Sequence, residues 1–288
     1  MFDVHIRDCG PRDGLQGESP QPVAVRRDLV LGLARAGLSE VEAVSFVSPK
    51  AVPAMADAQD VVQGLDESAT WWALVPNRRG AELALSAGID HLTITVSASE
   101  TYSQKNVGMS IAASIAQVAE IRSVARSALV DVVISCAFGS AQDVVRPDDV
   151  AKIYADVIAT GVDAVTLADT TGVATPARIE RVIRATGTDV GIHLHDTRGL
   201  ALTNAYAAYG LGVRRFDTAV GGIGGSPFAS GAGGNLATED LVLLFEDVGI
   251  STGVDLDRLL ALGRWLASML GRELPSRVSR AGRLPPAP

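Results

Sequence analysis

The chain alternates between two kinds of hydrophobic pattern from one end to the other. Short apolar runs rich in β-branched residues are separated by longer stretches in which apolar residues recur with helical spacing. Runs of the first kind are typical of buried β-strands, and stretches of the second kind are typical of amphipathic helices. The short runs predict strands over Val4–Asp8, Glu40–Val47, Thr70–Val75, His91–Val96, Leu129–Cys136, Ala164–Ala168, Val190–His195 and Arg215–Val220.

The longer stretches predict helices between these strands. The first, Val23–Ala36, carries an apolar stripe along one face. Pro176 suits the first turn of a helix, and the sequence Thr238-Glu-Asp is the acidic start favoured at a helix N-terminus. Similar helical stretches run over Asp148–Thr160, Pro176–Ala185 and Thr238–Val248.

Strands that alternate with helices along the whole chain indicate parallel pairing with helices on the outside. Eight such units in about 250 residues match a closed (β/α)8 TIM barrel. We therefore expect an α/β barrel, the catalytic domain, over residues 1–250, and a short C-terminal extension over residues 251–288. The extension should contain helices through Trp265 and Leu270, followed by a basic, proline-containing tail, Leu274–Pro288, that is partly disordered. A doubly wound open sheet is the alternative fold.

The charge balance and the cysteine content narrow the class of protein. The 33 acidic and 25 basic side chains give a formal charge of −8, which argues against nucleic acid or an anionic membrane as a partner. The sequence shows neither an apolar run long enough for a membrane span nor the pattern of a signal peptide. Cys9 and Cys136, the only cysteines, form neither a metal motif nor a disulfide framework. We expect a cytoplasmic protein.

Polar residues accumulate where the predicted strands end. In a parallel barrel these ends share one rim, where the active sites of barrel enzymes form. Any one of these residues is explained as a cap or a turn residue, but their placement around most of the barrel favours a site. The residues are Arg12, Asp13, Glu42, Asn77, Ser135, Asp169, His193 and His195.

Two of the four histidines, His193 and His195, lie two positions apart on the seventh predicted strand. This spacing places both rings on one face of the strand, roughly 7 Å apart at Cβ. Imidazole is the commonest metal ligand among side chains, so the pair offers half of a coordination site. The alternative is that hydrogen bonds in a polar pocket satisfy each ring.

Asp13 and Asn235 would complete a ligand set with the two histidines. Two nitrogens and two oxygens, with water or substrate in the remaining positions, suit Mg²⁺ or Mn²⁺ better than zinc. Arg12, next to Asp13, is always cationic and can stabilise an enolate or a carboxylate. The alternative for Arg12 and Asp13 is a surface ion pair.

A glycine-rich segment, Gly221–Gly234, contains seven of the chain's 29 glycines. Pro227 stands where a dinucleotide-binding fingerprint requires its third glycine, and the chain has no P-loop motif. Glycine at this density favours a lid whose backbone approaches a ligand closely, so Gly224 and Gly225 are candidate substrate contacts. An ordinary turn after the eighth strand is the alternative, and contact with an anion is a second role for the segment.

Five separated segments resemble 3-hydroxy-3-methylglutaryl-CoA lyase, a family within the metal-dependent barrel lyases and Claisen synthases. The resemblance is collinear over roughly residues 4–250. The segments are Gly10-Pro-Arg-Asp-Gly-Leu-Gln-Gly-Glu18, Glu42-Ala-Val-Ser-Phe-Val-Ser-Pro-Lys50, Asp169-Thr-Thr-Gly-Val-Ala-Thr-Pro176, His193-Leu-His-Asp-Thr197 and Gly234-Asn-Leu-Ala-Thr-Glu-Asp240.

The resemblance implies roles for individual residues. Arg12 would stabilise an enolate, while Glu42 and Asp169 would shape the catalytic site and Gln16 would orient the substrate. That substrate would be an acyl-CoA, and we expect the protein to form a homodimer. The resemblance also implies that the ligands of the divalent cation are Asp13, His193, His195 and Asn235.

One departure from the family pattern affects the chemistry. The family has a cysteine after Gly-Gly in the glycine-rich loop, where this chain has Ser226. In the family that cysteine is assigned the role of a catalytic acid, and a thiol with a pKa of about 8.5 exchanges protons usefully near neutrality. A serine hydroxyl is a far weaker acid, although it can donate a hydrogen bond or position water. Ser226 therefore indicates a divergent substrate or slow chemistry.

Together these features predict a divalent-metal-dependent carbon–carbon lyase. Its default substrate is 3-hydroxy-3-methylglutaryl-CoA, cleaved to acetyl-CoA and acetoacetate through a thioester enolate. A metal-oriented water, Asp13 and His193 are the candidate general bases. The alternatives are a lyase or aldolase acting on another 3-hydroxy acid or acyl-CoA, a Claisen-type synthase, and a weakly active binding barrel that owes its weakness to Ser226.

Overall fold

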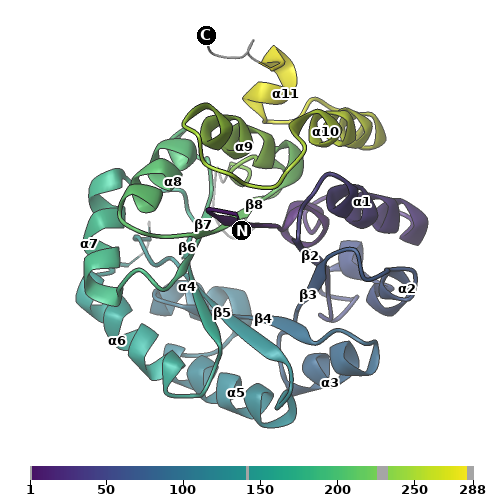
Figure 1. Cartoon of the computed structure of the whole chain (residues 1–288). Helices are drawn as coiled ribbons and strands as arrows, with labels where there is room; N and C mark the ends of the chain where they lie inside the picture. The colour runs from purple at the N-terminus through teal and green to yellow at the C-terminus, as the bar shows by residue number, and fades with distance from the viewer. Residues whose placement is uncertain (1, 141–142, 226–232, 284–288) are drawn as a thin grey trace.

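Eight parallel strands close into a barrel in the computed structural model, which describes residues 2–140, 143–225 and 233–283. Neighbouring strands pair in sequence order, and β1 closes the barrel against β8, with His5 opposite Arg215. Figure 1 looks along the barrel and shows the strands inside a ring of helices. The strands are β1 (His5–Asp8), β2 (Glu40–Ser45), β3 (Thr70–Leu74), β4 (His91–Ser97), β5 (Leu129–Ser135), β6 (Ala164–Asp169), β7 (Gly191–Leu194) and β8 (Arg215–Thr218).

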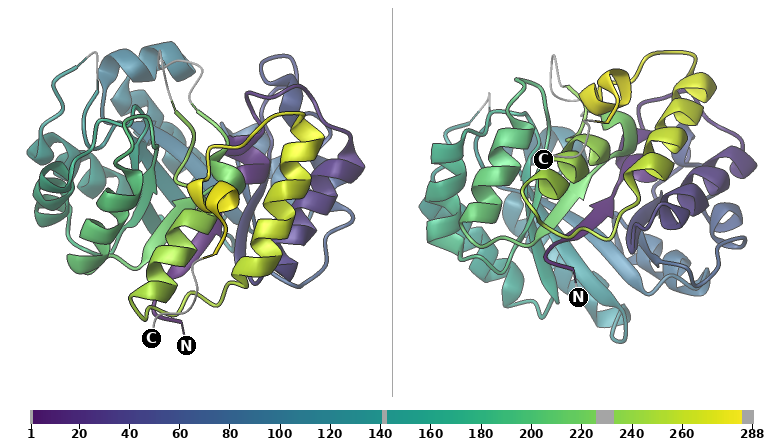
Figure 2. Two further views of the ribbon diagram at one scale, coloured as in Figure 1. Left: turned by 90° about the horizontal axis from the view of Figure 1, so that it is seen from above. Right: turned by 45° about the horizontal axis from the view of Figure 1, so that its top comes forward.

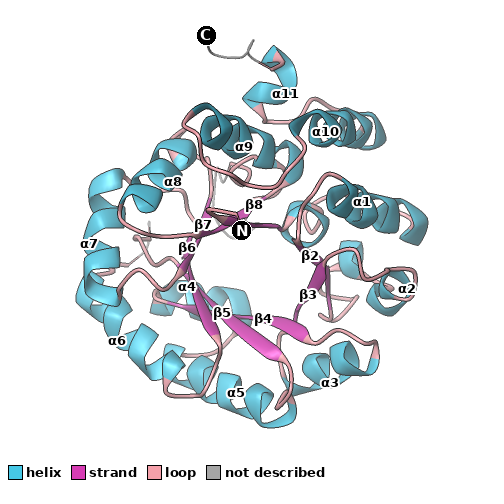
Figure 3. Ribbon diagram, viewed as in Figure 1, coloured by secondary structure: helices cyan, strands magenta, loops and turns pink. Residues whose placement is uncertain are grey.

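Helices cover the outer face of the barrel (Figure 3). Pro176 is the first residue of its helix, and the Thr175 hydroxyl accepts a hydrogen bond from the Arg178 N–H, as expected for a capped helix start. The helices are α1 (Val23–Arg35), α2 (Ala58–Val62), α3 (Arg78–Ser86), α4 (Glu100–Val107), α5 (Ile111–Val124), α6 (Pro147–Ile158), α7 (Pro176–Thr186), α8 (Ala201–Gly210), α9 (Thr238–Asp247), α10 (Leu256–Leu270) and α11 (Arg277–Ala281).

The predicted (β/α)8 barrel is confirmed, and the doubly wound open sheet is wrong because the strands form a closed ring. Each predicted strand is present within two residues of its predicted ends. Most strand residues are buried whichever face they occupy, since side chains fill the interior and helices cover the exterior. This double burial explains why apolar residues occupy both faces of strands such as β5 instead of alternating with polar ones.

The C-terminal segment adds two helices to the barrel. Helix α10 lies in the ring between α1 and α9, and α11 packs against α9 and α10 (Figures 1 and 2). The expected disorder of the tail is wrong for Arg277–Ala281, which forms α11. The domain boundary at residue 250 stays a prediction. In the part of the chain that the structure describes, every helix is too short or too polar to cross a membrane.

The carboxyl ends of β7, β8 and β1 lie side by side because these strands are consecutive neighbours. A one-turn π-helix, η1 (Gly10–Gly14), follows β1, and a short 3-10 turn, η3 (Val220–Gly222), follows β8. Strand β2 has a register shift between Glu42 and Val44. Such bulges redirect side chains next to active sites. The rim built by these elements carries most of the predicted site residues.

Candidate metal centre and active site

The two histidines at the end of β7 face one point of the barrel mouth. Their Nε2 atoms are 3.2 Å apart, and both side chains are almost fully buried. The other ring nitrogen of each is anchored: His193 Nδ1 lies 3.3 Å from Asp217 Oδ2, and His195 Nδ1 lies 3.3 Å from the Gly233 carbonyl oxygen. The same-face pair predicted from the spacing is therefore present.

The turn η1 brings Arg12 and Asp13 to the same place. The Cys9 carbonyl oxygen accepts hydrogen bonds from three consecutive N–H groups, beginning with that of Arg12, which tightens the chain directly after β1. Asp13 Oδ2 then lies 3.9 Å from His193 Nε2 and 4.0 Å from His195 Nε2. A carboxylate oxygen and two imidazole nitrogens thus share one small volume.

Asp13 is ionised despite its burial. Burial raises its pKa, but Arg12 and the two histidines outweigh this effect and bring the pKa down to about 2. Burial and the neighbouring His193 lower the pKa of His195 to about 4. Burial also lowers the pKa of His193, but Asp217 and Asp13 reverse this and raise it. The site offers a carboxylate and a neutral imidazole, which are the protonation states that metal ligands need.

Asn235 reaches the barrel mouth from the loop before α9, where a β-bridge pairs it with His195. Its amide nitrogen donates to Asp13 Oδ2 at 2.7 Å and to the Ile223 carbonyl oxygen at 3.0 Å. Its Oδ1 atom is buried and has no hydrogen-bond partner among the described residues. A buried acceptor without a donor costs free energy, and a cation would satisfy it.

Glycine is required where the glycine-rich segment passes Asn235. A Cβ atom on Gly224 would lie 2.6 Å from the Asn235 amide nitrogen, and Gly224 has a φ of +104°, which other residues rarely adopt. A Cβ atom on Gly234 would clash with the Gly222 carbonyl group. The described glycines on both sides of the segment therefore allow Asn235 to reach Asp13.

Gly225, the second predicted substrate contact, has a φ of +142° and ends the first described part of this segment. Ser226 and half of the expected lid, residues 226–232, lie outside the described residues. The structure therefore describes how the lid segment leaves η3 and how it rejoins the site at Gly233 and Asn235.

The predicted ligand set fits a divalent cation. Ligand atoms of Asp13, His193 and His195 all lie within 4.8 Å of one another. Together with Asn235 Oδ1 they supply two nitrogens and two oxygens, a set that suits Mg²⁺ or Mn²⁺ with positions left for water or substrate. We call Asp13, His193 and His195, together with Arg12 and Glu42, the mouth cluster.

Arg12 is held in place by two carboxylates. Its Nε donates to Glu42 Oε2 at 2.6 Å, and its Nη1 donates to Asp13 Oδ1 at 2.8 Å. Gln16 Nε2 also donates to Asp13 Oδ1, at 2.8 Å. The surface ion pair considered for Arg12 and Asp13 is wrong, because both side chains are buried. Glu42 and Gln16 thus orient the two residues that face the mouth.

Asp169 ends β6 and is bound to its own loop. Its two carboxylate oxygens accept hydrogen bonds from the N–H groups of Val173 at 2.8 Å and Ala174 at 3.0 Å. Burial raises its pKa to about 6. The hydrogen bonds described for Asp169 hold the β6–α7 loop and do not reach Asp13, so its catalytic role stays a prediction. Asn77, another rim residue, caps α3.

Three buried carboxylates next to these elements were missed by reasoning from sequence. Asp217, in the middle of β8, supports the first histidine of the pair. Asp8 and Glu239, called the outer pair, lie behind η1 and η3. Asp8 accepts a hydrogen bond from the Thr238 hydroxyl at 2.6 Å, and Glu239 accepts one from the Gly221 N–H at 2.9 Å. An acidic residue inside an otherwise apolar strand, such as Asp217, was the available signal.

The segment that leads into α11 ties the rim from outside. Leu274 packs against Gly221, and the Ser276 N–H donates to the Gly221 carbonyl oxygen at 2.9 Å. Arg277 Nη1 donates to Asp196 Oδ2 at 2.9 Å, directly after the histidine pair. Both η3 and the end of β7 are therefore attached to the C-terminal segment.

Comparison with known proteins identifies the family. The chain matches the HMGL-like family model over residues 3–266. It belongs to this family. A hydroxymethylglutaryl-CoA lyase from Bacillus subtilis is 39% identical over 286 residues, which cover 95% of each chain. An (R)-citramalyl-CoA lyase from Chloroflexus aurantiacus is 39% identical over 308 residues, covering 99% of this chain and 97% of that one.

A solved structure gives the same answer as the family model. An HMG-CoA lyase from Acinetobacter baumannii, in complex with coenzyme A and 3-methylmalate, superposes with a TM-score of 0.93 at 38% identity, covering 99% of this chain and 98% of that one. Membership of the HMGL-like family confirms the resemblance and the class of enzyme, a carbon–carbon lyase. The family depends on a divalent metal, which agrees with the ligand group at the mouth.

Proposed function

We propose that this chain cleaves a 3-hydroxyacyl-CoA thioester between C2 and C3, with Mg²⁺ or Mn²⁺ as cofactor. The observation that carries the proposal is that ligand atoms of Asp13, His193 and His195 lie close together at the mouth. Beside them, the Asn235 Oδ1 atom is buried without a donor among the described residues. The default substrate is 3-hydroxy-3-methylglutaryl-CoA, after which the relative from Bacillus subtilis is named. The proposed cation ligands are Asp13, His193, His195 and Asn235.

When bound, the cation lowers the pKa of a substrate hydroxyl, so that loss of its proton becomes feasible near neutral pH. Residues of the chain then act on the charge that develops elsewhere. As the C2–C3 bond breaks, its electron pair moves onto the thioester and forms an enolate. Arg12, fixed by Glu42, places a permanent positive charge beside the enolate oxygen. Protonation of the enolate carbon gives acetyl-CoA, and the default substrate leaves acetoacetate as the second product.

Asp13, one of the candidate general bases, is poorly suited to that role. Its pKa of about 2 makes its carboxylate a weak proton acceptor. Its oxygens already accept hydrogen bonds from Arg12, Gln16 and Asn235. We therefore assign Asp13 to cation binding rather than to removal of the substrate proton.

Citramalyl-CoA is a second candidate substrate, because the lyase for this thioester is as similar to the chain as the lyase from Bacillus subtilis. The two thioesters differ by one methylene between the hydroxyl-bearing carbon and the distal carboxylate. Both give acetyl-CoA, and the second product is acetoacetate or pyruvate. One methylene is worth only about 1–3 kcal/mol to an apolar pocket, so both thioesters must be assayed.

Steady-state assays on both thioesters, with acetyl-CoA as the readout, test the proposal. We expect turnover of at least one thioester that stops when EDTA removes the metal and returns when Mg²⁺ or Mn²⁺ is added. A kcat/KM above about 10⁴ M⁻¹s⁻¹, within the ordinary enzyme range, identifies the substrate. Turnover that persists in EDTA, or turnover of neither thioester, contradicts the proposal.

The substitution Ser226→Cys tests whether the glycine-rich loop serves 3-hydroxy-3-methylglutaryl-CoA or another substrate. We expect it to raise kcat on 3-hydroxy-3-methylglutaryl-CoA by about 10²–10⁴, the usual contribution of a general acid. Ser226→Ala is the matched control, because it changes the same position without supplying an acid. If Ser226→Cys leaves the activity on this thioester low and unchanged, the loop serves another substrate, and citramalyl-CoA becomes the first choice.

We also propose the cytoplasm as the setting of this enzyme and a homodimer as its assembly. The two cysteines are buried and unpaired, in keeping with a reducing compartment. Light scattering of the purified protein tests the assembly, and a monomer mass at assay concentration contradicts it.

A further inference from the structure

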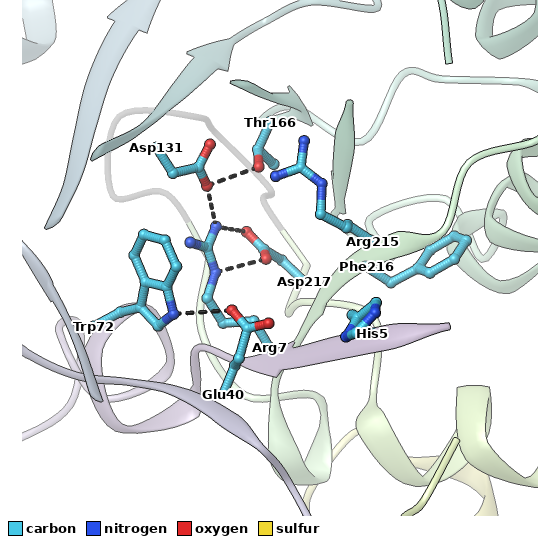
Figure 4. A pocket seen from close by; sticks show the side chains of 9 residues that line it. All are labelled: His5, Arg7, Glu40, Trp72, Asp131, Thr166, Arg215, Phe216 and Asp217. Atoms are coloured by element: carbon cyan, nitrogen blue, oxygen red, sulfur yellow. Dashed lines mark hydrogen bonds and ion pairs between the residues drawn. The ribbon is translucent and has the colours of Figure 1, made fainter. Parts of the chain in front are cut away.

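A buried ion-pair network lies inside the barrel, directly below the histidine pair. Asp217 of β8 connects this network to the histidine pair, since its Oδ2 atom lies 3.3 Å from His193 Nδ1. Arg7 of β1 binds Asp217 through two hydrogen bonds of 2.9 Å, from Nε to Oδ1 and from Nη2 to Oδ2. Figure 4 shows the guanidinium of Arg7 between the carboxylates of Asp217 and Asp131.

The rest of the network holds Arg7 from the opposite side of the barrel. Arg7 Nη2 lies 2.7 Å from Asp131 Oδ2 on β5, and that oxygen also accepts a hydrogen bond from the Thr166 hydroxyl at 2.9 Å. The indole ring of Trp72 lies 4.8 Å below the guanidinium carbon of Arg7. These side chains border a cavity of about 30 Å³, which is too small for a ligand larger than about two water molecules. Arg7 therefore has one well-defined position.

This arrangement leaves one hydrogen-bonding state for His193. A carboxylate paired with a guanidinium through both oxygens carries no proton, so Asp217 can only accept hydrogen bonds. His193 Nδ1 must then carry the hydrogen, and in the neutral ring Nε2 keeps its lone pair. His193 Nε2 is the atom that faces the second histidine and Asp13.

We propose that Asp217, held by Arg7, is a positioning residue that fixes His193 as the Nδ1–H tautomer and so presents its Nε2 lone pair to the cation. The proposal rests on the cation site proposed above. His195 has a neutral anchor for the same purpose, the Gly233 carbonyl oxygen. The two ligands of β7 are thus oriented by different means, one by a charge in the barrel interior and one by the backbone of the glycine-rich segment.

The same residues do not make a second metal site. Cys9, His193 and Asp217 also have ligand atoms within 4.8 Å of one another. The guanidinium of Arg7, however, already binds both oxygens of Asp217, and its positive charge repels a cation from that position. Asp217 therefore acts on the metal through His193 rather than as a ligand.

The substitution Asp217→Asn tests this role because an amide has one acceptor oxygen instead of two. The amide nitrogen must then face a donor, either Arg7 or His193, so the anchor is lost with little change in volume. Asp131→Asn is the matched control: it removes a charge from the same network but leaves the contact between Asp217 and His193 in place.

Mn²⁺ titrations of metal-free protein, followed by electron paramagnetic resonance and without substrate, give the readout. We expect Asp217→Asn to weaken Mn²⁺ binding by about 10–100-fold, the usual loss when the support of a ligating histidine is removed. Asp131→Asn should stay within about twofold of the wild type. Wild-type protein that binds no Mn²⁺ overturns both the proposed function and this inference. Equal binding by wild type and Asp217→Asn overturns this inference alone.

A second measurement does not depend on the folding of any variant. Imidazole nitrogen chemical shifts of the metal-free wild-type protein, recorded at alkaline pH where His193 is neutral, report its tautomer. We expect the Nδ1–H form. The Nε2–H form would show that Asp217 does not set the orientation of the ring, and the inference would fail.

Discussion

Asp8 and Asp13 are both buried and lie only five positions apart in the sequence, yet their pKa values are shifted in opposite directions. Burial raises the pKa of Asp8 to about 7. Burial also acts on Asp13, but Arg12 and two imidazoles lower its pKa to about 2. The difference lies in the neighbours: Asp13 faces cationic groups, whereas Asp8 accepts hydrogen bonds from the Thr238 hydroxyl and the Gly10 N–H.

Glu239 makes the same point for the second member of the outer pair. Burial raises its pKa to about 8, and its hydrogen-bond donors are the Gly221 N–H and the Ser279 hydroxyl. The outer pair thus holds the backbone turn η3 and the C-terminal segment, while the mouth cluster keeps a charged carboxylate available. In this barrel, neighbouring positive charges distinguish the carboxylate of the candidate site from the carboxyl groups that support the turns. Burial alone does not distinguish them, because all three groups are buried.

Removing a histidine from the mouth cluster should have the largest effect. His193→Ala or His195→Ala should abolish Mn²⁺ binding and turnover, because each removes one of the two nitrogen ligands from the proposed set of four protein ligands. His91→Ala is the control, since it removes a half-buried strand histidine that contacts Trp72 and Asp90 instead. Turnover by either mouth variant, measured as acetyl-CoA formation, would place the site elsewhere.

Arg12→Gln should have the next largest effect, and it should act on catalysis. In the proposed mechanism the positive charge of Arg12 matters most when the enolate forms, so kcat should fall by about 10²–10³ while KM changes little. Arg184→Gln, which removes an exposed arginine from α7, is the control and should leave both constants unchanged. If kcat of Arg12→Gln equals that of the wild type, the ion pair with Glu42 serves the fold alone.

Glu239→Gln in the outer pair should have the smallest effect, and it should act on stability. A carboxyl group whose pKa is raised by folding binds a proton more tightly in the folded state, so its stabilisation is complete below the unfolded pKa. That stabilisation is lost as the pH rises through the folded pKa of about 8. The wild type should therefore lose on the order of 3–4 kcal/mol more than Glu239→Gln between pH 5 and pH 8.

Denaturant unfolding at several pH values checks this difference. Glu246→Gln is the matched control, because Glu246 lies on the same helix in a more exposed ion pair with Arg283. Parallel stability curves for the wild type and Glu239→Gln would mean that Glu239 is ionised in the folded protein. The contrast between the outer pair and the mouth cluster would then be lost.

Most of the fold was readable from sequence because the barrel repeats one simple pattern. A strand covered on both faces is rich in apolar, β-branched residues, and a helix on the outside shows a helical stripe, so every strand was found within two residues of its ends. The predicted tail was less accurate. Its arginines and prolines resemble a disordered segment, but Ser276 and Val278 are buried against the helix that starts at Thr238.

The predicted cation ligands came from spacing and resemblance, and the structure brings all four together. Asp217 and Glu239 were not predicted, because their roles depend on partners far away in sequence. Asp217 is paired with Arg7, which is 210 positions earlier, and Glu239 holds Gly221 from the next helix. A single buried carboxylate looks the same in sequence whether it binds a metal, supports a ligand or holds a turn.

The attachment of the rim to the segment around α11 has a consequence for how the candidate site is supported. Ser276 binds Gly221 after β8, and Arg277 binds Asp196 after β7, so one segment joins the ends of two neighbouring strands. A local unfolding of α11 would therefore release both strand ends together, and the support of the histidine pair would depend on a helix that contributes no residue to the proposed ligand set.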